Sequence, residues 1–208
     1  FDERLSLIAT KDGYIDFNPD GVLAEDEGFA NLGAGIKYAF VHDPSAGTVV
    51  SGIFRYEAPT GNTDVLQGKG DGEIQPSISA AMALTDELTF MGATGLRIAV
   101  DNDYSSFWNA DAHVDYKLGN FYPLLEVNMV HVYDAGNLLP IADEGADLFN
   151  FGASGSDGKT LVTGAVGARY RACDNIDFGV AYQIPLTNGQ GSETFEWRLT
   201  ADMIYRFS

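Results

Sequence analysis

Apolar and polar side chains alternate in segments that recur along the whole chain, separated by clusters of Gly, Asn, Asp and Pro. In the clearest segment, residues 107 to 118, the even positions carry Trp, Ala, Ala, Val, Tyr and Leu, and the odd positions carry Asn, Asp, His, Asp and Lys. A period of two places successive side chains on opposite faces of a strand, so each segment has one apolar and one polar face. The pattern predicts an all-β chain.

The alternation predicts about ten strands, each close to the length of roughly 10 residues that a strand needs to cross a bilayer. They cover residues 3 to 10, 29 to 42, 48 to 58, 74 to 84, 88 to 99, 107 to 118, 122 to 133, 160 to 172, 177 to 186 and 194 to 207. The chain begins at Phe1 without an initiator Met or a charged and apolar leader. We therefore expect a processed or incomplete chain, and a count of ten to twelve strands stays open.

The links between these segments alternate in length. Long links at 18 to 28, 59 to 73 and 134 to 158 are separated by tight ones at 43 to 47, 85 to 87, 119 to 121 and 173 to 176. Short turns on one rim and long loops on the other are typical of outer-membrane barrels, whose short turns are periplasmic. An even strand count then predicts that both termini lie on the periplasmic side. A Greek-key sandwich has no reason to alternate in this way.

Composition excludes several other classes. The net charge of -18 and the pI of about 4.2 argue against nucleic-acid binding, which needs a basic patch. Cys173 is the single cysteine, so neither an intrachain disulfide nor a Cys-based zinc cluster can form. No apolar run approaches the roughly 18 residues of a spanning helix. We predict a single domain over residues 1 to 208, a transmembrane antiparallel up-and-down β-barrel of 10 to 12 strands in a bacterial outer membrane.

The last strand, "TFEWRLTADMIYRF", is unusually rich in aromatic residues on its apolar face. In a membrane barrel that face meets lipid, and aromatic side chains gather near the two interfaces. The stretch is similar to the C-terminal recognition signal of bacterial outer-membrane proteins, with Ser208 as a small departure. We also expect this strand to pair with the first one, because lipid cannot satisfy the backbone groups of an open edge.

Four stretches of the chain resemble one known family. They are "YEAPTGNTDVLQGKGDGEIQPSISAAMAL", "GATGLRI", "ADAHVDYKLGNFYPLLEVN" and the closing "YRF". The family is the group of outer-membrane proteins labelled MetA-pathway of phenol degradation, and the resemblance runs from about Leu5 to Phe207. It implies an outer-membrane barrel of transporter type that passes small solutes, with small aromatic compounds as an expected class. No catalytic residues are implied.

Charged and polar side chains on the inward strand faces are the candidate lumen residues. They are Arg55, Glu57, Arg97, Asp111, His113, Asp115, Lys117, Glu126, Arg169, Arg171, Arg198 and Asp202. One interpretation is a constriction that selects among ions or solutes. The other is a salt-bridge network that fills the barrel and seals it, since barrels of about 8 strands are filled whereas those of about 16 are open. Small inward residues such as Ser79 and Ala81 favour a narrow pore.

The long links are acidic, and one of them is also apolar. Their carboxylates include Asp20, Glu25, Asp71, Glu144 and Asp147. Such a rim could bind lipopolysaccharide phosphates through divalent cations, attract cations to a pore, or simply stay solvated. The apolar residues within 134 to 158 predict that this link folds inward or packs on a partner, so a homo- or hetero-oligomer formed through the loops stays open.

An enzyme is the weakest alternative, because no nucleophile stands beside a base. His42 is placed at a turn, His131 on the lipid face and His113 in the lumen. His113 lies between Asp111 and Asp115, but no inward Ser or Cys pairs with it. We therefore expect a satisfied lumen histidine, no catalysis, and neither a cofactor nor a metal ion.

Overall fold

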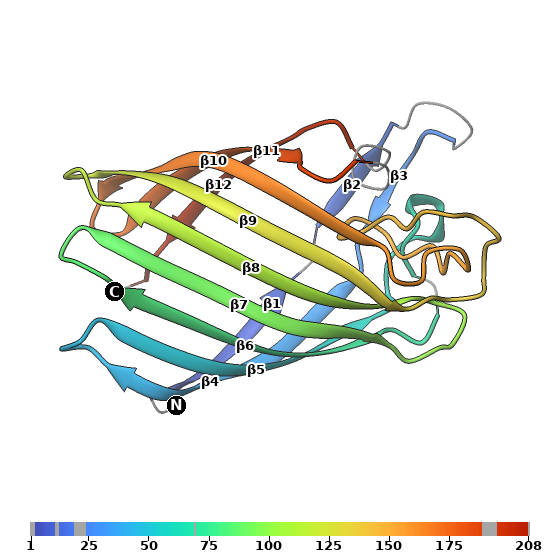
Figure 1. Ribbon diagram of the computed structural model, residues 1–208, viewed down its shortest axis with the longest axis horizontal. Helices are drawn as coiled ribbons and strands as arrows, with labels where there is room; N and C mark the ends of the chain where they lie inside the picture. The colour runs from blue at the N-terminus through green and yellow to red at the C-terminus, as the bar shows by residue number, and fades with distance from the viewer. Residues whose placement is uncertain (1–2, 11–12, 19–23, 69, 189–194, 208) are drawn as a thin grey trace.

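The computed structural model describes residues 3–10, 13–18, 24–68, 70–188 and 195–207. Ten strands form one antiparallel sheet in the order β1-β4-β5-β6-β7-β8-β9-β10-β11-β12 (Figure 1). Their bounds are β1 Leu5–Thr10, β4 Leu32–Asp43, β5 Thr48–Ala58, β6 Glu73–Ala83, β7 Leu88–Ala99, β8 Ser106–Tyr116, β9 Phe121–Asp134, β10 Thr160–Cys173, β11 Ile176–Pro185 and β12 Arg198–Tyr205. Every strand is bonded to its neighbour in the chain apart from an insertion between β1 and β4, so the up-and-down prediction is confirmed.

The predicted strands recur with boundaries that differ by a few residues. Asp20 and Thr194 lie outside the described residues. Among the described residues, no helix is long and apolar enough to cross a bilayer.

The two ends of the sheet differ, as the link lengths predicted. Tight turns join the strands at one end, here called the turn end, and both termini lie there (Figure 1). The longer links lie at the opposite end, here called the loop end, and the longest of them, residues 135–159, is called the long loop.

A small hairpin at the loop end was not predicted from the sequence. It consists of β2 (Tyr14–Phe17) and β3 (Asp26–Phe29), which form a separate two-stranded sheet. The side chain of Asn62 accepts a hydrogen bond from the Phe29 amide, just before the short 3-10 helix η1 (Thr63–Val65). These strands are too short to show the alternation that marks the others, so the sequence pattern overlooks them.

The faces of the large sheet follow the predicted alternation. Outward side chains such as Phe54, at 52% exposed, and Leu125, at 62%, are apolar and uncovered. Inward neighbours such as Glu57, at 6% exposed, and Thr163, at 4%, are polar and buried. Many outward residues are large and apolar, which suits contact with lipid tails.

The sheet does not close, which corrects the expected pairing of first and last strands. Among the described residues, β1 pairs with β4 alone and β12 pairs with β11 alone. These edge strands have six and eight residues, whereas the strands between them have 10 to 14. The edge strands are therefore shorter than every strand between them.

Candidate functional site in the lumen

A buried polar network stands at the loop end of the inner face. Arg97 donates from Nε and Nη2 to the two carboxylate oxygens of Glu73, at 2.9 and 3.0 Å, and both residues are at most 9% exposed. Its guanidinium also lies 4.7 Å from the ring centroid of Phe107. A two-point ion pair on adjacent strands fixes both side chains, because the planar fork of arginine matches a carboxylate.

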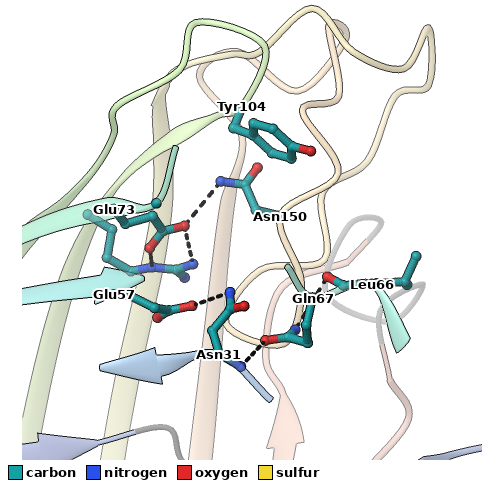
Figure 2. Close-up of a pocket in the computed structure, with 9 residues that line it drawn as sticks. Asn31, Glu57, Leu66, Gln67, Glu73, Tyr104 and Asn150 are labelled. Atoms are coloured by element: carbon teal, nitrogen blue, oxygen red, sulfur yellow. Dashed lines mark hydrogen bonds and ion pairs between the residues drawn. The ribbon is translucent and has the colours of Figure 1, made fainter. Parts of the chain in front are cut away.

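The same network continues onto β5 and the segment before β4. The amide of Asn31 donates to Glu57 at 3.0 Å, and Asn150 donates to Glu73 at 3.2 Å (Figure 2). Gln75 lies between the two acids and donates to Glu73 at 3.1 Å. The cavity among these residues has a volume of only about 40 Å³, so they fill the inner face here.

The long loop folds onto the barrel end, which confirms that it packs. Glu144, at 2% exposed, accepts from the Ser105 hydroxyl at 2.6 Å and from the amides of Phe151 and Ala153. Arg97 Nη1 donates to the Ala146 carbonyl at 3.1 Å. The loop therefore has fixed attachments to β7 and to the link before β8.

One ion pair joins the long loop to the other side of the sheet. Arg198 on β12 donates to both oxygens of Asp147, at 2.7 and 2.9 Å. Burial would raise the pKa of Asp147, but the hydrogen bonds and charge of Arg198 outweigh it and hold that pKa below its ordinary value. The carboxylate is consequently ionised near neutral pH.

His113 is held at the middle of the lumen between two acids. Its Nδ1 lies 2.7 Å from Glu126 Oε1 across the β8–β9 pair, and its Nε2 lies 3.3 Å from Asp115 Oδ2. Both ring nitrogens are therefore engaged, as the structural interpretation of this residue predicted. Among the described residues, no group of three or more His, Cys, Asp and Glu side chains is arranged to hold a metal ion.

Ion pairs also occupy the turn end. Arg169 on β10 donates to both oxygens of Asp202 on β12, at 2.8 and 3.0 Å, across the intervening β11. Gly179 lies between them in register with both, and an added Cβ there would meet the Asp202 carboxylate and Arg169. Glycine is needed at this position because the pair crosses directly over it.

Three larger cavities follow one another along the inner face and share lining residues. The loop-end cavity, about 330 Å³, shares Asp111, Glu126 and Asn128 with a middle cavity of about 250 Å³. The middle cavity shares Met91 and His113 with a turn-end cavity of about 430 Å³. The predicted lumen residues Asp111, His113 and Glu126 therefore stand where these spaces meet.

Two predicted lumen residues are placed differently from the rest. Lys117 lies one residue past the end of β8 and is exposed, and its amide donates to the Glu87 carbonyl. Gly119, with φ +64, then allows the tight turn into β9. Arg55 lies in register with Gly35 and Gln75, and its buried Nε has no hydrogen-bond partner among the described residues.

Several residues that hold the site were not among the predicted ones. Asn31, Asn150 and Asp147 lie in links, where strand alternation gives no direction. Glu73 is the first residue of β6, although the sequence pattern assigned it to the link of residues 59 to 73. Asp177, at 1% exposed, is the second residue of β11 and lies on the same face as Gly179, so strict alternation along that strand would have found it.

Comparisons with known proteins agree with this architecture. The solved structure of the NanC porin is similar, with a TM-score of 0.59 over 98% of this chain and 93% of the porin at 9% sequence identity. That likeness shows a porin-like fold. No curated protein matches the sequence. The family described as "Putative MetA-pathway of phenol degradation" matches residues 6–189. Family and fold together place the protein in the bacterial outer membrane, and the chain belongs to this MetA-pathway family.

Proposed function

We propose that this protein is a narrow, water-filled channel through which small solutes diffuse passively across the outer membrane. The observation that carries the proposal is the row of three cavities with shared lining residues between the loop end and the turn end. Charged or polar side chains stand in the lining of every one of these cavities, among them Asp111, His113 and Arg169, and they suit a route for hydrated solutes. In this proposal the chain is a single channel domain and not an enzyme, with the loop end outside the cell.

Charge at the loop-end cavity favours cations over anions at the outer mouth. Asp111, Glu126 and Asp147 line that cavity together with one arginine, Arg198. Because carboxylates raise the local concentration of cations, we expect the open channel to be cation-selective.

The proposed solutes include small aromatic compounds. The family's description names phenol degradation, and the middle cavity offers Val49, Ala81, Met91 and Ala93 beside the polar His113. A flat, mostly apolar molecule with one hydroxyl group fits that combination of surfaces.

The test is the conductance of the purified protein in a planar bilayer under a salt gradient. We expect discrete steps, a reversal potential of cationic sign, and brief interruptions when phenol is added. Ala93→Phe narrows the middle cavity and is expected to lower the conductance. Ala110→Phe, on the neighbouring strand and outside the described cavities, serves as the matched control. A silent bilayer containing folded protein would refute the channel.

The rival function is a sealed structural or assembly barrel. The folded long loop favours it, because its attachments through Glu144, Ala146 and Asp147 hold it across the loop end. In that case the acidic loops would bind a partner or lipopolysaccharide. Removal of the loop would then disturb assembly and leave the membrane impermeable.

A further inference from the structure

Guanidinium groups gather at the turn end of the lumen. The turn-end cavity, about 430 Å³, is lined by three arginines, Arg169, Arg171 and Arg206. The loop-end cavity, by contrast, has one arginine, and that one is paired with Asp147. The chain has a net charge of -18 and only 12 Lys and Arg residues, so three arginines in the lining of one cavity call for an explanation.

A single buried carboxylate holds two of these arginines. The Asp177 side chain is 2% exposed and accepts from Arg171 Nε at 3.2 Å and from Arg206 Nη2. The two guanidinium side chains are themselves 42% and 45% exposed. Two positive charges share one negative charge, so this group of three residues keeps a formal charge of +1.

The two arginines retain hydrogen-bond donors for another partner. A guanidinium carries five N–H groups. Within the described part of the chain, Arg171 uses Nε, and Arg206 uses Nη2, for its side-chain hydrogen bonds. The ring of Tyr122 lies 5.4 Å from the Arg171 guanidinium and orients its plane. The arrangement is therefore preorganised to receive a planar oxyanion by paired N–H bonds.

The rest of the cavity sets the size and character of such a ligand. Arg169 is neutralised by Asp202, and the remaining carboxylate, Asp115, is engaged with His113. With Asp202 counted beside Arg169, three arginines face three carboxylates, and the formal charge is zero with His113 neutral. The excess positive charge is local to Arg171 and Arg206, which share Asp177. Met91, Leu124 and Ile204 supply an apolar surface beside the arginines.

We propose that the turn-end cavity binds a small organic carboxylate, whose charged group is held by Arg171 and Arg206 and whose apolar body contacts Met91, Leu124 and Ile204. The idea that such carboxylates are solutes of this protein rests on the proposed channel function. The idea that the cavity binds them rests on the turn-end geometry alone. With the loop end outside, the site opens toward the periplasm, and the acidic loop-end cavity separates it from anions outside the cell.

The test is calorimetric titration of the full chain, folded in a nonionic detergent, with benzoate. We expect binding by benzoate and none by benzyl alcohol, which has a similar apolar body without the charge. Arg171→Gln should weaken benzoate binding about tenfold or more, the cost of a lost charge-assisted hydrogen bond. Asp177 keeps Arg206 as its partner in this variant, so the strand end stays paired.

Lys117→Gln is the matched control, since it removes one positive charge at the same end of the sheet without lining the cavity. It should leave benzoate binding unchanged. Arg171→Lys should recover only part of the affinity, because it restores the charge but not the planar fork. Equal benzoate binding by Arg171→Gln and the natural protein would overturn the site, as would tighter binding of inorganic phosphate than of benzoate.

Bilayer recordings separate this proposal from the channel itself. Benzoate added on the turn-end side should interrupt the current more than benzoate added on the loop-end side. Calorimetric binding with a silent bilayer would reject the channel and keep the site. A conducting bilayer without calorimetric binding would keep the channel and reject the site.

Discussion

At the scale of single residues, the inner face is organised by paired charges. Arg97, Arg169 and Arg198 each engage one carboxylate through two nitrogen atoms. Their partners Glu73, Asp202 and Asp147 come from a neighbouring strand, a strand two places away and a loop, respectively. These pairs differ in burial, so their loss should have different consequences.

Replacing Arg97 by Met should destabilise the fold by about 3 to 5 kcal/mol, because it leaves the carboxylate of Glu73 buried without its counter-ion. The measurement is urea-induced unfolding in detergent micelles. Lys117→Gln, at an exposed turn, should change the free energy of unfolding by less than about 0.5 kcal/mol. The double variant Arg97→Met with Glu73→Leu should recover most of the loss. An Arg97→Met variant as stable as the natural protein would show that the pair contributes nothing.

At the scale of elements, the long loop is the part of the molecule that joins distant strands. Its attachments reach β7 through Arg97, the link before β8 through Ser105, and β12 through Arg198. The first two lie in a buried region, whereas Asp147 and Arg198 are 40% and 26% exposed at their side chains. The attachment to β12 is therefore the one that the solvent can reach.

Acid should release the long loop from β12. The folded pKa of Asp147 is below the ordinary value of 3.8, so its stabilising contribution is complete above that value and is lost as the pH falls through the folded pKa. We expect the single-channel conductance to change as the pH is lowered below 3.8. Asp147→Asn should remove that component of the pH dependence. An identical acid profile in both proteins would show that the loop is held elsewhere.

At the scale of the whole molecule, the two edges of the sheet decide whether it closes into a barrel in a bilayer. β1 and β12 each pair on one side within the described residues. An unpaired backbone group in hydrocarbon costs several kcal/mol, so the bilayer favours contact between these edges. The chain directions allow an antiparallel pair, because β1 leaves the turn end and β12 returns to it (Figure 1).

Disulfide cross-linking in lipid vesicles tests this contact. With Cys173→Ser as background, Ala9→Cys is combined in turn with Leu199→Cys, Ala201→Cys or Met203→Cys, all on the outward face by register. We expect one combination to form a disulfide efficiently in lipid and less so in urea. The reference pair is Ala34→Cys with Tyr56→Cys, which are already aligned on adjacent strands. Efficient reference cross-linking with none across the edges would mean that the edges stay apart.

The sequence by itself determined most of the fold, because its information is local. Alternation along each strand indicated which side chains face lipid, as Phe54 outside and Glu57 inside show. Link lengths indicated which strand ends share a rim. The hairpin β2–β3 escaped that pattern because four-residue strands hold too few alternations. β12, with eight residues, is also shorter than the strand of residues 194 to 207 that its aromatic pattern predicted.

Only the tertiary structure decided which charges meet. His113 was expected to lie between Asp111 and Asp115, yet strand register placed Glu126 of β9 at its Nδ1. Asp147 reaches Arg198 across 51 residues of chain, and Asp177 joins Arg171 to Arg206 in the lining of the turn-end cavity. Register and loop path are set by packing between segments far apart in sequence, and periodicity along one strand carries no information about them. Within the described residues, the outer edges of β1 and β12 are unpaired, which alternation along each strand did not predict.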